Sequence, residues 1–386
     1  MKTCIGQDLS SIKKHINNFG IPDEIMFYTN ITQIKGIDGI VDYGSGIQSL
    51  PKLKMLYDPK EGEDTPLLGS VNIGLWLSSV PGLHSIISGE LDDNLRTIHD
   101  AVVKQRWKEV DLRIGYEFDN PDFSYYDVDA AESGDEQDPS YCSLYWSAGT
   151  STYKDAYRYV VNFIRSLSGS SSDDGKTEWN YVWHSWGRGT SGTGRCGFEY
   201  WYPGDAYVDK VGVSLFNAPF NDGVNNTSQA NEKGKGGDDK VNENMGTARA
   251  VGEFARGRGK ELIIAESAPF GGVYEGVWGD WFEVVEEFVV DYDVSTWCYI
   301  DCDWDSQRMW KGVGFGDTRL TSDELTSEMW RGVEWGLFLD KDKDEGKWGR
   351  LGVGVCLIVG LAVYTLTAVG WSRKRGSRRY SYERIR

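Results

Sequence analysis

Short runs in which hydrophobic and polar residues alternate recur along the chain and predict eight β-strands. They lie at 4–10, 24–31, 71–79, 111–118, 180–186, 210–217, 261–267 and 294–304. Stretches with the period of an amphipathic helix separate them, for example 95–107, 153–167, 244–257 and 281–292. Strands that alternate with helices form a parallel sheet, and eight of them favour a closed (β/α)8 barrel of the TIM-barrel type over an open sheet.

A different pattern follows near the C-terminus. Residues 351–371, LGVGVCLIVGLAVYTLTAVGW, are 21 residues without a charge, and about 20 apolar residues span a bilayer as a helix. A buried core helix is the alternative, but the length favours a single transmembrane helix in contact with a lipid bilayer. The basic residues 373–375 predict a cytoplasmic C-terminus. The rest of the protein would then be extracellular or luminal.

This assignment divides the chain into four parts. We expect a barrel domain at 1–339, a charged stalk at 340–350, the transmembrane helix at 351–371 and a basic tail at 372–386. The first ten residues, MKTCIGQDLS, lack the apolar run of a signal peptide. We therefore expect the sequence to be incomplete at its N-terminus, with insertion by the tail as the alternative. Three glycosylation triplets fit an extracellular glycoprotein: Asn30, Asn225 and Asn226.

The charge and the aromatic content of the chain indicate which kinds of ligand it can bind. The net charge is −18, although the last 15 residues carry seven basic side chains and one acidic one. The remainder is strongly acidic and repels polyphosphate, so we expect no nucleic-acid partner. The chain has 16 Trp and 21 Tyr. Such rings stack on the apolar faces of sugars, and they also fill protein cores.

The number and spacing of the cysteines and histidines argue against a disulfide scaffold and a zinc site. Six cysteines are too few for a disulfide scaffold, and with only four histidines no zinc spacing occurs, so we expect no metal and no cofactor. An extracellular location favours a Cys142–Cys196 disulfide, because both cysteines lie in loops on one face of the predicted barrel. Cys298 and Cys302, on one strand about 13 Å apart, are too distant to bond.

Two glutamates stand where a barrel places its chemistry. Glu117 ends the fourth predicted strand and Glu266 ends the seventh, and barrel active sites lie at the C-terminal ends of the strands. A retaining glycosidase requires two carboxyl groups, one to protonate the leaving oxygen and one to attack the anomeric carbon. Solvated strand ends are the alternative for either residue alone.

Four segments resemble glycoside hydrolase family 26, of clan A, in their order and spacing. They are RIGYEFD, YVWHSW, YWYPGDAYVDKVGVSLFN and IIAES. The resemblance extends from about Gln7 to about Trp335 and implies a β/α barrel. It also implies that Glu117 is the proton donor and Glu266 the nucleophile. The family implies a β-linked polysaccharide substrate, most often mannan and in some members β-glucan or xylan.

The sequence departs from typical mannanases near both glutamates. Tyr116 stands where those enzymes have a histidine before the acid, and Phe216 where they tend to have a tyrosine. A phenyl ring cannot donate a hydrogen bond to the nucleophile. We expect both residues to line the substrate site, and the departures bear on mannan specificity more than on the barrel.

Other residues are candidates on weaker grounds. Arg113 shares the inner face of the fourth strand with Glu117, and would either orient a carboxylate or form a structural ion pair. Trp183 and His184 end the fifth strand, and one of them could contact sugar. Trp304 is a candidate stacking platform or a core residue. Asp8 could bind a distal sugar.

The predicted function is a membrane-anchored retaining glycoside hydrolase, which cleaves a β-linked polysaccharide or oligosaccharide by a two-glutamate double displacement. The alternative is a catalytically inert carbohydrate-binding barrel at the cell surface. The retention of Glu117 and Glu266 favours the enzyme.

Overall fold

The computed structural model describes residues 1–57, 69–132, 134–135, 138–168, 176–187, 196–216, 237–273 and 277–334. The chain divides into two compact units, Met1–Ser322 and Asp323–Arg386. In the second unit the described part holds α9 (Glu324–Glu334). Within the described ranges no helix is long and apolar enough to cross a membrane. The predicted stalk, membrane span and tail lie outside these ranges.

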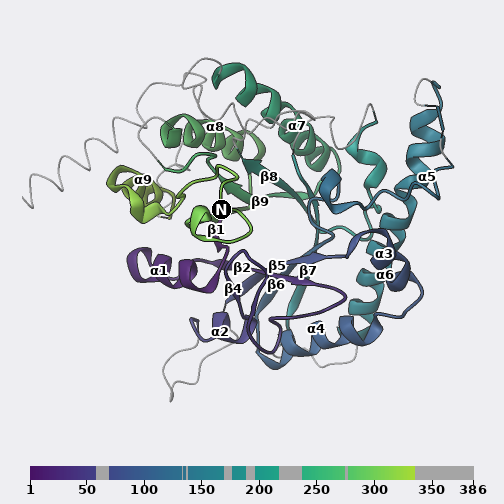
Figure 1. The fold of residues 1–386 in the computed structure, drawn as a ribbon, viewed down its shortest axis with the longest axis horizontal. Coiled ribbons are helices and arrows are strands. Elements are labelled where there is room, and N and C mark those ends of the chain that lie inside the picture. The colour runs from purple at the N-terminus through teal and green to yellow at the C-terminus, as the bar shows by residue number, and fades with distance from the viewer. Residues whose placement is uncertain are drawn as a thin grey trace, which may run out of the picture. The chain divides into compact units, whose positions relative to one another are not determined.

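The first unit is a closed parallel barrel, as predicted (Figure 1). Its strands are β1 (Lys2–Gly6), β2 (Glu24–Asn30), β5 (Ser70–Trp76), β6 (Glu109–Ile114), β7 (Glu178–Ser185), β8 (Lys210–Phe216), β9 (Glu261–Ala268) and β10 (Thr296–Ile300). Their order around the barrel is β1-β10-β9-β8-β7-β6-β5-β2. Each of the eight predicted runs overlaps one of these strands. A two-stranded sheet of β3 (Val41–Asp42) and β4 (Ile47–Gln48) was not predicted.

Helices surround the barrel in Figure 1. They are α1 (Leu9–Phe19), α2 (Leu50–Lys54), α3 (Ser79–Ile87), α4 (Asp92–Lys104), α5 (Ser147–Gly149), α6 (Ser151–Ser168), α7 (Gly237–Gly257) and α8 (Val277–Tyr292). The predicted helical stretches correspond to α4, α6, α7 and α8. In α6 the buried side chains recur every three or four residues, as at Tyr153, Tyr157, Val160 and Ile164, so one face packs inward.

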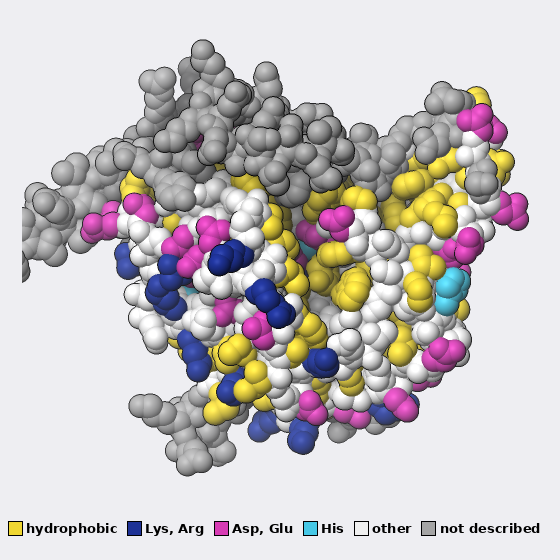
Figure 2. Space-filling model, viewed as in Figure 1, with side chains coloured by type: hydrophobic (Ala, Val, Ile, Leu, Met, Phe, Trp, Pro, Cys, Tyr) yellow, Lys and Arg dark blue, Asp and Glu magenta, His cyan; other side chains and the backbone are white. Residues whose placement is uncertain are grey.

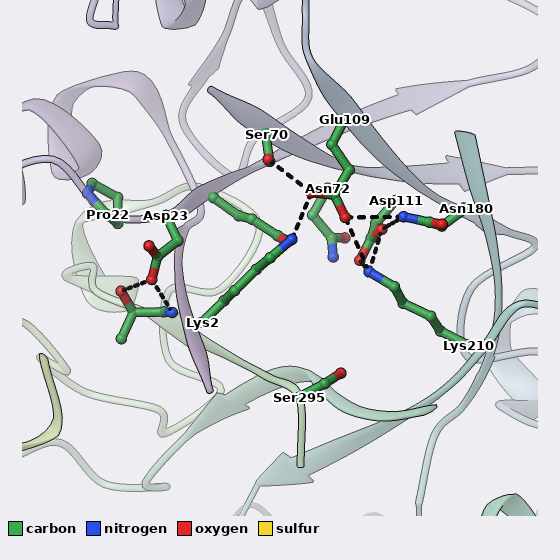
Figure 3. A network of polar contacts seen from close by, with 12 residues as sticks. Lys2, Pro22, Asp23, Ser70, Asn72, Glu109, Asp111, Asn180, Lys210 and Ser295 are labelled. Atoms are coloured by element: carbon green, nitrogen blue, oxygen red, sulfur yellow. Dashed lines mark hydrogen bonds and ion pairs between the residues drawn. The ribbon is translucent and has the colours of Figure 1, made fainter. Parts of the chain in front are cut away.

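The N-terminal end of the barrel is filled by charged and polar side chains (Figure 3). Lys2 donates to Glu109 Oε2 at 2.5 Å, and Lys210 Nζ lies 2.8 Å from Asp111 Oδ1. Lys2, Glu109 and Lys210 are the first residues of their strands, and Asp111 is the third residue of β6. Glu24, at the start of β2, is fully buried beside it. These residues close the barrel opposite the end where chemistry is expected.

The next layer is apolar and tightly packed. Val182, Ile263 and Ala265 form a buried cluster. Gly212 on β8 faces them, and a Cβ there would lie 3.0 Å from the Ala265 side chain and 3.3 Å from Cβ of His184. A side chain at this position would therefore press on β7 and β9 by a few tenths of an ångström, and glycine lets the three strands pack closely.

The cysteine predictions are confirmed among the described residues. Cys142 and Cys196 form a disulfide with their Cα atoms 5.4 Å apart. Cys4, Cys298 and Cys302 are buried free thiols, so Cys298 and Cys302 do not bond to each other. The disulfide joins the loop after β6 to the loop after β7, and thus ties down two segments at the C-terminal end of the barrel.

Candidate active site

Glu117 lies in a turn at the C-terminal end of β6. The sequence predicted a strand through residue 118, but β6 ends at Ile114, and Gly115 and Glu117 have φ angles of 57° and 50°. A left-handed conformation is unfavourable for a non-glycine residue and is often retained at functional sites. The turn directs the Glu117 side chain into a largely buried position, 7% exposed.

Two side chains hold the Glu117 carboxyl group. Ser214 Oγ on β8 donates to Glu117 Oε1 at 2.7 Å, and Asn120 Nδ2 donates to Oε2 at 3.1 Å. Asn120 is itself fixed, because its Oδ1 accepts a hydrogen bond from the backbone N–H of Asp122 at 3.0 Å. Both oxygens of the carboxyl group therefore have a defined orientation.

A β-bulge brings Glu266 to the same place. Val213 pairs with Ile264, but the next residue, Ser214, pairs with Glu266, so Ala265 is an extra residue on β9. Ala265 packs in the barrel interior, and strict alternation would turn its neighbour Glu266 outward. The bulge re-aims Glu266, so that its Cα is paired with that of the serine that contacts Glu117.

Arg113 on β6 binds the second glutamate. Its side chain is fully buried, and its Nη1 atom donates to Glu266 Oε1. The guanidinium carbon lies 5.0 Å from the centre of the Tyr28 ring and 5.5 Å from that of Tyr116, within cation–π range. Arg113 thus both orients a carboxylate and forms a buried ion pair, and it stabilises Glu266 as an anion.

His184 connects the two glutamates through hydrogen bonds. It ends β7 inside the barrel, where its Nε2 lies 2.9 Å from Ser214 Oγ and its Nδ1 lies 3.4 Å from Arg113 Nη1. Burial and then the charge of Arg113 hold the pKa of His184 well below 6.5, so the imidazole is neutral at physiological pH. A continuous chain of polar contacts therefore runs from Glu117 to Glu266.

Tyr116 and Phe216 are half-buried at the end of the barrel that carries the two glutamates. The Tyr116 ring lies 5.7 Å from Tyr28 and 5.2 Å from Phe123. Burial, and then the charges of Glu266 and Glu117, raise the pKa of its phenol. In the same view as Figure 1, hydrophobic side chains border a hollow over the barrel (Figure 2). Both residues remain candidates for contact with substrate.

Two predicted sugar contacts are wrong because both indoles are buried. Trp183 is fully buried and stacks on Phe118 at 4.4 Å. As the neighbour of His184 on a strand, it faces away from the barrel interior. Trp304 is 1% exposed, its ring is stacked on Phe315 at 4.4 Å, and its Nε1 donates to Thr318 Oγ1. Neither ring offers a face to a sugar.

Asp8 also has a structural role, since it is the N-cap of α1. It accepts hydrogen bonds from the backbone N–H groups of Ser10 and Ser11 at 2.8 and 3.2 Å, and it is 4% exposed. Asn30, predicted as a glycosylation site, is likewise buried, and its Oδ1 accepts bonds from Thr32 and Ser78. The structure therefore argues against a glycan at Asn30. Asn225 and Asn226 lie outside the described residues.

The sequence analysis missed three residues of this region. Ser214 lies two positions before Phe216, so the strand period places both on one face. Trp76 ends β5 on the same face as Gly74. A Cβ added at Gly74 would lie 3.1 Å from the Arg113 side chain, so this face of β5 looks toward Arg113. The indole of Trp76 is half-buried. Asp119 accepts hydrogen bonds from Ser185 Oγ and the Trp186 N–H, which tie the Glu117 turn to β7. Burial raises the pKa of Asp119 to about 6.

No protein-family model matches this chain. The chain is 23% identical over 356 residues to a β-1,3-xylanase from a Vibrio species, and 22% identical over 355 residues to one from an Alcaligenes species. Each match covers 85% of this chain, which spans only 63% and 62% of the length of the two relatives.

Solved structures with a similar arrangement include family 26 mannanases. A modular endo-β-1,4-mannanase from Cellulomonas fimi aligns with 88% of this chain and 70% of its own, at 14% identity and a TM-score of 0.48. A β-mannanase from Bacteroides ovatus aligns with 90% of this chain and 94% of its own, at 12% identity and a TM-score of 0.48. Both TM-scores are below 0.5, so the evidence for the barrel is the order of its strands. The resemblance to glycoside hydrolase family 26 therefore rests on the sequence motifs.

Proposed function

We propose that this protein is a retaining glycoside hydrolase, with Glu117 as proton donor and Glu266 as nucleophile. One observation carries the proposal: Ser214 hydrogen-bonds to Glu117, and its Cα is paired with that of Glu266. The carboxyl group in the turn after β6 and the one on β9 therefore lie at the same end of the barrel, as this chemistry requires. The names of the curated relatives, both β-1,3-xylanases, support the same class of reaction.

The contacts of the two glutamates support a different role for each in this proposal. Glu266, held as an anion by Arg113, attacks the anomeric carbon, while Glu117 transfers its proton to the departing glycosidic oxygen. Glu117 is then a carboxylate and takes a proton from the water that hydrolyses the glycosyl ester on Glu266. The product keeps the anomeric configuration of the substrate, because the two displacements each invert it.

The substrate that we propose is a β-linked polysaccharide, with β-1,3-xylan first. The relatives similar over 85% of the chain are β-1,3-xylanases, and Tyr116 and Phe216 replace two residues typical of mannanases. Mannan and other β-glycans are the alternatives. Trp76, half-buried at the end of β5, is the indole that we propose for stacking on a sugar.

The test measures sugar release from β-1,3-xylan, β-1,4-xylan, mannan and β-glucan by the full-length protein. Glu117→Ala and Glu266→Ala should abolish release from natural polysaccharide. Glu261→Gln is the matched control, because this exposed glutamate starts β9 at the opposite end of the barrel; it should retain activity. Binding without turnover by the unmodified protein would favour the inert carbohydrate-binding barrel.

We also propose that residues 351–371 anchor the protein in a membrane, with the barrel outside or in the lumen. The supporting features are the 21 uncharged residues and the basic residues that follow them. Protease added to intact cells should then remove residues 1–350 and spare 372–386. A body that is cleaved only after permeabilisation would contradict this orientation.

A further inference from the structure

We propose that Ser214 and His184 determine which oxygen of Glu117 carries its catalytic proton, and that this oxygen is Oε2. The inference rests on the proposed function, because it concerns the acid of that reaction. Ser214 and His184 act as positioning residues here, since neither is the group that transfers the proton to substrate.

The direction of each hydrogen bond follows from Arg113. A guanidinium group can only donate, so Arg113 Nη1 donates to His184 Nδ1, which lies 3.4 Å away. A neutral imidazole that accepts at Nδ1 carries its proton on Nε2. His184 therefore donates from Nε2 to Ser214 Oγ at 2.9 Å.

The next bond is fixed in turn. A serine hydroxyl has one proton, and its oxygen already accepts from His184. Ser214 consequently donates its proton to Glu117 Oε1 at 2.7 Å. Oε1 thus accepts the shorter of the two hydrogen bonds to Glu117, since Asn120 Nδ2 lies 3.1 Å from Oε2. The carbonyl oxygen of a neutral carboxyl group is a better acceptor than its hydroxyl oxygen, so a protonated Glu117 carries its proton on Oε2. All four residues are at most 7% exposed, so water competes weakly for these bonds.

The direction of these hydrogen bonds has two consequences for the reaction. In the first displacement the O–H bond at Oε2 breaks and the proton passes to the glycosidic oxygen, whose bond to the anomeric carbon breaks with both electrons. Glu117 remains as a carboxylate that Ser214 and Asn120 stabilise by hydrogen bonds. A bond that favours the ionised form lowers the pKa of the acid, so Ser214 should set the alkaline limit of activity.

The test is the pH dependence of kcat/KM for full-length Ser214→Ala, His184→Phe and the double variant. Ser214→Ala should move the alkaline limb upward by about one pH unit, because the ionised form of Glu117 loses a donor. His184→Phe should move it in the same direction, since the freed serine can then accept a proton from Glu117. The double variant should shift no further than Ser214→Ala, because both act through one bond.

Ser267→Ala is the matched control for a change in packing. Ser267 is a fully buried serine next to Glu266, and its hydroxyl donates to the Cys298 carbonyl. This variant should lose stability and keep the pH limits of the unmodified protein. An alkaline limb for Ser214→Ala that coincides with that of Ser267→Ala would overturn the proposal, and so would fully additive shifts in the double variant.

A second measurement separates this inference from the proposed function. Carbon-13 NMR of carboxyl-labelled glutamate, with Glu117 assigned by loss of its signal in Glu117→Gln, gives the pKa of Glu117 without any substrate. Ser214→Ala should raise that pKa by about one unit. If the protein hydrolyses no glycan yet the pKa rises, the proposed function fails and the hydrogen-bond order stands. If glycans are hydrolysed and the pKa does not change, the order of bonds is wrong.

Discussion

Replacement of Glu24 by glutamine should stabilise the protein at alkaline pH. Glu24 is fully buried at the start of β2, and it accepts a hydrogen bond from Lys2, a member of the network in Figure 3. Lys2 Nζ lies 3.2 Å from Oε1, and Oε2 has no hydrogen-bond partner in the described part of the chain. Burial, and then the charge of Asp111, raise the pKa of Glu24 from 4.5 to about 8, although Lys2 and Lys210 oppose the shift.

The sign and size of the effect follow from proton linkage. The pKa of Glu24 is higher in the folded state, so between pH 4.5 and about 8 the folded protein holds a proton that the unfolded chain releases. The resulting stability is complete below the unfolded pKa and is lost as the pH rises through the folded pKa. The loss is about 1.4 kcal/mol per pH unit, which amounts to the order of 5 kcal/mol across this window of 4.5 to about 8. Glutamine cannot ionise and avoids this loss.

The assay is urea unfolding of the unmodified protein, Glu24→Gln and Glu178→Gln at about pH 5 and about pH 9. Glu178 is an exposed glutamate at the start of β7, and its variant should follow the unmodified protein at both values. The free energy of unfolding of Glu24→Gln, relative to the unmodified protein, should increase by several kcal/mol from the lower to the higher pH. A difference that stays constant with pH would refute the buried, protonated state of Glu24.

Three further predictions concern the disulfide and the residues around the barrel mouth. Replacing Cys142 and Cys196 by serine opens a loop with a sequence separation of 54, and should lower the free energy of unfolding by at most about 4 kcal/mol in urea titrations. Asp8→Ala should cost about 1 kcal/mol through loss of the N-cap and leave KM unchanged; a large rise in KM would restore a sugar-binding role. Trp76→Ala should raise KM for polysaccharide, whereas Trp304→Phe should change thermal stability and not KM, and the reverse pattern in steady-state kinetics would contradict our assignment of the two indoles.

The barrel could be predicted from the sequence because each strand is long enough to show a period. The ends of the strands could not be predicted as well. The sequence pattern extends the fourth strand through Glu117, but the chain leaves the sheet at Ile114 and turns with a positive φ angle at Glu117. The pattern of alternation cannot detect such a turn. The β3–β4 sheet has two residues in each strand, which is too short to show any period.

The carboxylates and the disulfide were predictable from position, but the roles of neighbouring side chains were not. Trp183 and His184 are adjacent on a strand, so at most one of them could face the barrel interior, and the sequence did not say which. Asp8 stands before a helix in DLSS, which is also the signature of an N-cap. Ser214 gave no signal by type; its role depends on a β9 bulge that no sequence pattern marks.

The most direct test of the central claim is to locate the covalent intermediate. The full-length protein would be incubated with a 2-deoxy-2-fluoro β-xylobioside that carries an activated leaving group, and the labelled peptide identified by mass spectrometry. The fluorine slows both displacements while the leaving group preserves the first. We predict one label, on Glu266, and its disappearance in Glu266→Gln. A label on another residue, or inversion at the anomeric carbon during hydrolysis of the parent glycoside, would contradict the role of Glu266 as nucleophile.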